Sequence, residues 1–178
     1  MLKRFVLTLC MLSIGAVSAN AEDLVVELAG GKLTLKSPAD WKTKAPASRI
    51  VEKEFAIPSS DGDGRCTIMQ ATGSFEANVD RWVGQVQQPD GSSSKEKAKT
   101  ATKKVGDLEV QTFDLAGTYL DSRGPGTPIT KKEKYRVLVG VLNTKKSGAY
   151  FIKFYGPEKL VAENEKAFNA MIESATEK

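Results

Sequence analysis

The chain has no histidine among its 178 residues. Histidine is the usual near-neutral general base, the activating partner in serine and cysteine triads, and a common zinc ligand. Its absence excludes those catalytic centres and His-ligated zinc, and leaves enzymes that use carboxylates, a lysine or a serine–lysine pair. We predict no catalytic residue, no metal site and no cofactor. The acidic run Asp61–Gly64 is interpreted as a turn, because Arg65 and Thr72 stand where a calcium loop needs oxygen ligands.

Cysteine is almost as scarce. Cys10 lies in the N-terminal apolar segment, and Cys66 is the only cysteine in the rest of the chain. No disulfide within the chain is therefore expected once that segment is removed. We interpret Cys66, which shares an expected strand with Ile68, as a small buried apolar residue. The alternative is a structural homo-oligomer joined through Cys66.

Long apolar runs are absent except at the N-terminus. Lys3 and Arg4 precede the apolar stretch 5–17, and Ala19-Asn20-Ala21 supplies the small residues of a signal peptidase site. The stretch is shorter than the ~20 residues that span a bilayer. The sequence therefore predicts a secretory signal peptide over residues 1–21 and a single α+β domain over residues 22–178. The protein would be periplasmic or extracellular, with no membrane span after cleavage; an uncleaved anchor is the alternative.

A strong excess of one charge sign is absent as well. After loss of Lys3 and Arg4 the chain carries 24 basic and 22 acidic residues, a net charge of +2. This balance gives no support for nucleic-acid binding. Lysines do gather at positions 95, 97, 99, 103, 104, 131, 132 and 134. An anionic envelope polymer is one partner for them, but we favour a solvated sheet edge that discourages pairing with other chains.

The residues that are present predict strands and two helices. Alternating patterns predict strands over residues 24–28, 32–35, 49–57, 65–72, 95–104 and 108–120. The first helix begins after Ser74, a good N-terminal cap, and ends before Pro89. The second begins at Pro157, because proline is tolerated in the first turn. Their apolar stripes are Phe75, Val79, Trp82 and Val86 in the first helix and Leu160, Phe168, Met171 and Ile172 in the second.

Two late segments are apolar on both faces. In residues 135–142 and 148–155, large apolar side chains occupy odd and even positions alike. Strands of this kind are usually covered on both faces, and two of them close in sequence form a natural central antiparallel pair. The predicted fold class is therefore α+β, a three-layer α/β/α sandwich around a mostly antiparallel sheet of six or more strands.

Three segments resemble a group of exported bacterial proteins that have no assigned activity. They are Gly73–Gln85, Asp114–Tyr119 and Tyr150–Pro157, and the resemblance covers most of the mature chain. The architecture is also similar to the fold of the photosystem II extrinsic subunit PsbP and its bacterial relatives. The resemblance implies a non-enzymatic accessory or binding module. It transfers no site residues, because a fold does not fix a function.

The first predicted helix carries candidate ligand-binding residues on one flank. At about 100° per residue, Asn78, Arg81 and Gln85 lie together beside the apolar stripe. Their donors could grip a carboxylate, a sugar or a peptide backbone. The simpler interpretation is that they bond neighbouring loops and tie the helix to the sheet.

Lys153 is the fourth candidate, because it lies among apolar residues. A dehydrated lysine has a lowered pKa and could act as a base or nucleophile. The simpler interpretation is an ion pair with Asp114 or Glu133, or a charged end that reaches water.

We therefore predict an exported, non-catalytic binding or accessory module of the cell envelope. Its partner would be an unidentified envelope protein or a small ligand. A carboxylate- or lysine-dependent hydrolase that acts on an envelope polymer is the first alternative. A structural homo-oligomer is the second.

Overall fold

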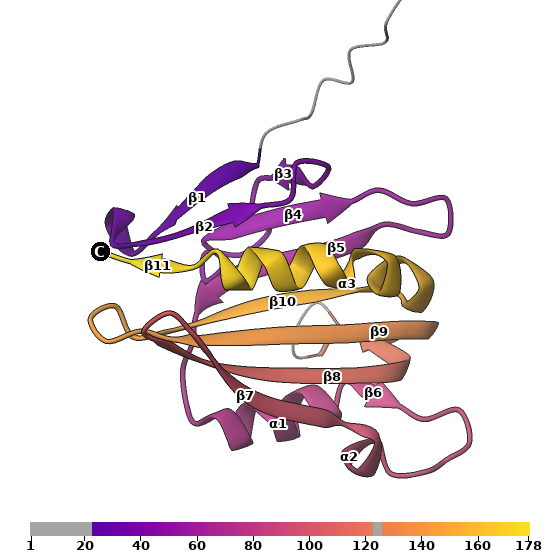
Figure 1. Ribbon diagram of the computed structural model, residues 1–178. Coiled ribbons are helices and arrows are strands. Elements are labelled where there is room, and N and C mark those ends of the chain that lie inside the picture. The colour runs from indigo at the N-terminus through magenta and orange to yellow at the C-terminus, as the bar shows by residue number, and fades with distance from the viewer. Residues whose placement is uncertain (1–22, 123–125) are drawn as a thin grey trace, which may run out of the picture.

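The computed structural model describes residues 23–122 and 126–178, so the predicted signal peptide lies outside the described residues. Within them, an eight-stranded sheet has the order β3-β4-β5-β10-β9-β8-β6, and β7 also pairs with β8 (Figure 1). All of these pairings are antiparallel. The strands are β3 (Lys42–Lys44), β4 (Lys53–Ile57), β5 (Gly64–Gln70), β6 (Val86–Gln87), β7 (Lys99–Val105), β8 (Leu108–Asp121), β9 (Thr130–Asn143) and β10 (Ala149–Pro157).

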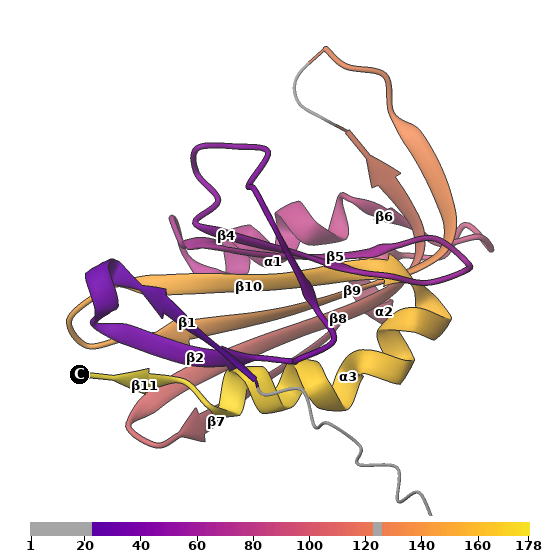
Figure 2. The ribbon, with the colours of Figure 1, turned by 90° about the horizontal axis from the view of Figure 1, so that it is seen from above.

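The central position predicted for the last two strands is confirmed. β10 lies between β5 and β9, and β9 lies between β10 and β8. Helix α3 (Glu158–Glu173) covers one face of this sheet and helix α1 (Phe75–Val83) the other (Figure 2). Phe154 packs against Phe168 on the α3 face, whereas Phe151 packs against Trp82 on the α1 face. The three-layer α/β/α architecture follows from these two buried faces.

A small second sheet joins α3 in its layer. It contains β1 (Leu24–Leu28), β2 (Leu33–Ser37) and β11 (Thr176–Glu177) in the order β1-β2-β11. The turn between β1 and β2 is the 3-10 helix η1 (Ala29–Gly31). Apolar residues of β1 and β2 belong to the same core cluster as α3 and the underlying sheet. Helix α3 lies very close to β9 at Gly140. A Cβ at that position would stand only 2.4 Å from Cδ1 of Ile172, so the close approach requires glycine there.

Helix α1 begins where the sequence predicts and ends earlier. The hydroxyl of Ser74 accepts the backbone N–H of Ala77, as expected of an N-terminal cap. The predicted stripe extends to Val86, but the helix ends at Val83. Val86 instead forms β6 against Tyr119 of β8 and is buried there. The pairing of β6 with β8 is the physical reason for the shorter helix, because it draws the chain after Val83 onto the sheet.

Two predicted strands are also shorter than expected. The first starts at Lys53 instead of residue 49, because Val51 closes a turn onto the carbonyl of Ser48. In the lysine-rich segment, helix α2 (Ser94–Lys97) precedes β7. The lysines of β7 lie on an outer strand that pairs only with β8 among the described residues, which fits the solvated edge. No helix of the described chain has the length and apolarity that crossing a membrane requires.

Two segments project from the α1 side of the main sheet (Figure 2). One is the loop between β3 and β4, residues 45–52. The other, called the arm here, consists of residues 118–121 of β8 and 130–134 of β9. The pairing register shifts between Gly117 and Tyr119, and Lys134 on the other strand has a φ of 53°. A bulge bends a strand, which explains why the arm leaves the plane of the sheet.

Candidate functional site

A groove lies on the α1 side between the loop 45–52 and the arm. Its volume is about 760 Å³. The loop and the arm supply its walls, and strands β4, β5 and β10 supply its floor. The lining includes Ala47 and Ser48 from the loop, Arg65 and Tyr155 from the floor, and Asp121 and Lys132 from the arm.

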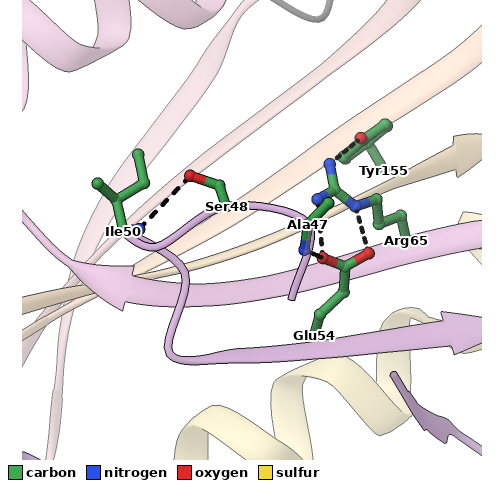
Figure 3. Close-up of polar contacts among 6 residues, drawn as sticks. All are labelled: Ala47, Ser48, Ile50, Glu54, Arg65 and Tyr155. Carbon is green, nitrogen blue, oxygen red and sulfur yellow. Dashed lines mark hydrogen bonds and ion pairs between the residues drawn. The ribbon is translucent and has the colours of Figure 1, made fainter. Parts of the chain in front are cut away.

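An ion pair between two strands fixes the floor of this groove (Figure 3). The carboxylate of Glu54 on β4 accepts two hydrogen bonds of 2.9 Å from Nε and Nη2 of Arg65 on β5. Nη1 of Arg65 donates to the hydroxyl of Tyr155 at 2.9 Å. Oε2 of Glu54 also accepts the backbone N–H of Ala47, which ties the loop to the sheet. The hydrogen bonds from Arg65 lower the pKa of the buried Glu54 carboxyl despite its burial.

Lys153 continues this polar strip along β10. It lies on the α1 face between Phe151 and Tyr155, which share its side of the strand. Its Nζ donates to Oε1 of Gln85 and, at 3.4 Å, to the hydroxyl of Tyr119. The same Nζ lies 5.3 Å from the ring centroids of Tyr119 and Tyr155, a distance at which aromatic rings attract a cation. The surrounding groups therefore hold the ammonium through neutral oxygens and ring faces.

The surroundings of Lys153 disfavour its charge. Its residue surface is partly exposed, yet dehydration of the ammonium is the largest cause of a pKa lowered to about 7. The positive charges of Arg81 and Arg65 lower this pKa further, and Asp121 opposes them only weakly. A lysine in this state changes its charge near neutral pH.

The other three predicted site residues have different roles. Asn78 is buried, and its Nδ2 donates to the carbonyls of Thr72 and Ser74 at 2.9 and 2.7 Å. Its Oδ1 accepts a hydrogen bond from Nη2 of Arg81. Asn78 thus ties α1 to the preceding loop and positions Arg81, as the simpler interpretation of this flank expects.

Gln85 lies beyond the end of α1 and reaches the sheet. Its carbonyl accepts the backbone N–H of Leu120 at 2.8 Å, while its side chain holds Lys153. The structure therefore brings Gln85 and Lys153 into contact, with Arg81 close enough to act on Lys153 through its charge.

The predicted ion pairs of Lys153 are wrong. Asp114 bonds Arg136 at 2.8 and 2.9 Å, and Arg136 also reaches Glu165 of α3. Asp114 therefore serves the opposite face of the sheet. Glu133 is exposed on the arm, and among the described residues no carboxylate forms an ion pair with Lys153.

Sequence reasoning missed the residues that join Lys153 to the groove. Tyr119 and Tyr155 pack with ring centroids 4.8 Å apart, and Tyr119 stacks on Tyr135 at 6.2 Å. Arg65 and Glu54 complete the set. A usable signal was present, because Glu54 lies inside one predicted strand beside Phe55 and Arg65 begins the next one beside Cys66.

Cys66 lies on the other face of β5, within the α3-side core. It is completely buried, and burial raises the pKa of its thiol. This environment agrees with its interpretation as a small buried apolar residue. A second chain could reach its sulfur only if the strand opened, so the structure does not support a homo-oligomer joined through Cys66.

Comparisons with known proteins identify the fold. No family model and no curated protein sequence matches the chain. The solution structure of cyanobacterial PsbP (CyanoP) from Synechocystis sp. PCC 6803 matches with a TM-score of 0.56 at 12% identity, covering 94% of this chain and 99% of that one. The crystal structure of LpqN, involved in cell envelope biogenesis of Mycobacterium tuberculosis, matches with a TM-score of 0.50 at 9% identity, covering 87% and 90%. The fold is therefore PsbP-like, as the resemblance implies, and at these identities the likeness concerns the fold alone.

Proposed function

We propose that the protein is an exported, non-catalytic binding module of the cell envelope, and that it binds its partner at the groove between the loop 45–52 and the arm. The observation that carries the proposal is the fixed polar floor of this groove. Glu54, Arg65 and Tyr155 bond one another across three strands and also hold the loop at Ala47. A pre-ordered polar surface loses little conformational entropy when a partner binds.

The walls of the groove favour a protein partner. Ile50 on the loop is 71% exposed, and Ile129, next to the arm, is 60% exposed. Large apolar side chains exposed beside a polar groove are typical of interaction surfaces when they lie together on one side of a molecule. Similarity in fold to LpqN, which is involved in cell envelope biogenesis of Mycobacterium tuberculosis, is compatible with an accessory role for this chain as well.

Binding is tested by capture from envelope extract with matched variants. The purified protein, immobilised, should retain a partner that Arg65→Ala together with Ile50→Ser no longer retains. Lys146→Ala with Leu24→Ser is the matched control, because both residues are exposed and lie away from the groove. Circular dichroism should show that both double variants fold. Equal retention by wild type and both variants would contradict the proposal.

Export is tested separately. If residues 1–21 are a signal peptide, protein recovered from the periplasm or the medium should begin at Glu22. Mass spectrometry of the intact protein decides this, and a chain that keeps Met1–Ala21 in the membrane fraction would contradict export by cleavage.

A lysine-dependent hydrolase is the second candidate, because the pKa of Lys153 is about 7. A lysine of this kind can serve as a general base at neutral pH. Hydrolysis of envelope polymers by the wild type, abolished in Lys153→Arg, would favour it, since arginine keeps the charge but does not accept a proton. Hydrolysis that is absent, or is retained in Lys153→Arg, counts against this candidate.

A further inference from the structure

Two cations at the end of α1 have no carboxylate partner in the described chain. Arg81 donates to the neutral Oδ1 of Asn78, and Lys153 donates to the neutral side chains of Gln85 and Tyr119. Among residues 23–122 and 126–178, no carboxylate lies within the 4.0 Å ion-pair distance of either cation. Charged groups withdrawn from water are ordinarily paired. Arg81 is exposed, but the Lys153 ammonium is dehydrated, so Lys153 departs from this rule.

The neighbouring carboxylates are already engaged. Glu54 is bonded to Arg65, and Asp121 is paired with Lys132 at 2.7 Å. With Lys153 protonated, the cluster of these six side chains therefore holds two more positive charges than negative ones. Both extra charges belong to Arg81 and Lys153, and the charge of Arg81 acts on Lys153 strongly enough to lower its pKa.

We propose that Arg81 and Lys153 bind one oxyanion group of the partner, a carboxylate or a phosphate. This inference rests on the proposed binding function and names the chemistry that the site recognises. Arginine offers two parallel donors that match the oxygens of such groups, and lysine adds a point charge with further donors. Asn78 and Gln85 hold the two cations in place without neutralising them.

The site lies at the end of the groove floor. Tyr155 lines the groove and also presents its ring to the Lys153 ammonium. A partner that lies in the groove over Arg65 and Tyr155 can therefore extend toward Lys153 along β10. We expect the oxyanion to anchor one end of such a partner.

Binding of an anion should depend on pH through Lys153. The charged and titratable groups around Lys153 from every packed element are Arg81 of α1, Arg65 of β5, Tyr119 and Asp121 of β8, Lys132 and Tyr135 of β9, and Tyr155 of β10. Side chains of these types ordinarily titrate outside the range from about pH 6 to about pH 8.5. Lys153, with a pKa of about 7, loses its charge within it. Affinity for an anion should therefore fall as the pH rises.

The test is calorimetric titration of the purified protein with sulfate, which keeps its charge over this range. We expect sulfate to bind about fivefold or more tightly at about pH 6 than at about pH 8.5. Arg81→Gln should weaken binding about tenfold, because it removes a bidentate charged donor. Lys95→Gln is the matched control, since it removes one positive charge from an exposed lysine of α2 that is paired with Asp80 of α1, the helix that carries Arg81. It should leave the affinity unchanged.

Two further titrations identify the source of the oxyanion. Stronger binding of phosphate than of succinate would point to a phosphorylated partner, and the reverse would point to an acidic peptide or sugar; either result supports the site. Equal weakening in Arg81→Gln and Lys95→Gln would overturn the proposal, because it would indicate diffuse attraction. Affinity independent of pH would overturn the role of Lys153. Capture of a partner at the groove without any anion binding would remove this inference and leave the proposed function standing.

Discussion

The two faces of the central strands differ in the partners that their positively charged side chains have. On the α3 face, Arg136 has two carboxylate partners, Asp114 and Glu165, each at 2.8 Å. On the α1 face, Arg65 is paired with Glu54, but Arg81 and Lys153 have only neutral partners. Arg136 and Lys153 lie on the neighbouring strands β9 and β10, so the difference between them lies in their side-chain partners.

This difference distinguishes cations that stabilise the fold through a carboxylate partner from cations that remain free to bind a ligand. Where a cation only stabilises the fold, the chain supplies its counter-charge, and the Asp114 hydrogen bonds raise the pKa of Arg136. Where the described residues supply none, as for Lys153, the cost of dehydration persists and lowers its pKa to about 7. Retaining such a cost is expected at sites that bind or react.

The largest expected effect is a loss of stability when a core side chain on the α3 face is removed. Phe154→Ala should lower the free energy of unfolding by about 3–5 kcal/mol, because it removes a completely buried ring that packs on Trp41 and Phe168. Urea denaturation measures this. Sulfate affinity of the folded fraction should not change, since the side chain points away from the α1 face. A loss below about 1 kcal/mol would show that this core is not tightly packed.

The second effect concerns the paired charges of the groove floor. Glu54→Gln should cost about 1–3 kcal/mol, less than for a fully buried pair, because the Arg65 side chain is 37% exposed. It should also speed hydrogen exchange at the Ala47 amide, which Glu54 holds. Glu173→Gln is the control, since its pair with Lys103 is exposed. Equal costs for the two variants would show that the Glu54–Arg65 pair does not fix the floor.

The third effect is a pH dependence. The folded-state pKa of Lys153, about 7, lies below the ordinary lysine value of about 10.4. Below pH 7 both states carry the charge, so its dehydration cost is fully present, and the cost declines as the pH rises through 7 toward the unfolded value. Wild type should therefore gain stability relative to Lys153→Met by up to about 1.4 kcal/mol per pH unit in that window. A difference that stays constant with pH would contradict the dehydration of this ammonium.

The smallest effect is expected on the arm. Lys132→Gln removes a partly exposed ion pair with Asp121, and such pairs contribute less than about 1 kcal/mol. Unfolding by urea should shift by no more than about 0.5 kcal/mol. A larger loss would indicate that the arm is a cooperative part of the fold instead of a projecting wall.

Most of the layer architecture could be predicted from the sequence. The two-faced segments 135–142 and 148–155 indicate the central pair because their apolar residues occupy both strand periods. The shortened α1 could not be predicted, since Val86 fits the helical stripe as well as β6 and only its pairing with Tyr119 decides between them. The small sheet likewise depends on β11 at the far end of the chain.

The candidate site was predicted only in part. Local spacing places Arg81 and Gln85 on one flank, and apolar neighbours single out Lys153. The partners of Lys153 could not be predicted, because strand register decides that Tyr119 faces it while Asp114 faces α3. Local sequence does not specify which strands become neighbours, so the groove floor formed by Glu54, Arg65 and Tyr155 was also beyond reach.

The most direct test of the account is to map sulfate binding on the protein by NMR. Amide and side-chain amine signals should shift at Arg81, Gln85 and Lys153 and remain unchanged over α3 and its core. Lys95→Gln should preserve this pattern, and at the same sulfate concentration Arg81→Gln should strongly reduce it. Shifts spread along the lysines of β7, or none at the end of α1, would contradict the claim that Arg81 and Lys153 on the α1 face form an anion-binding site.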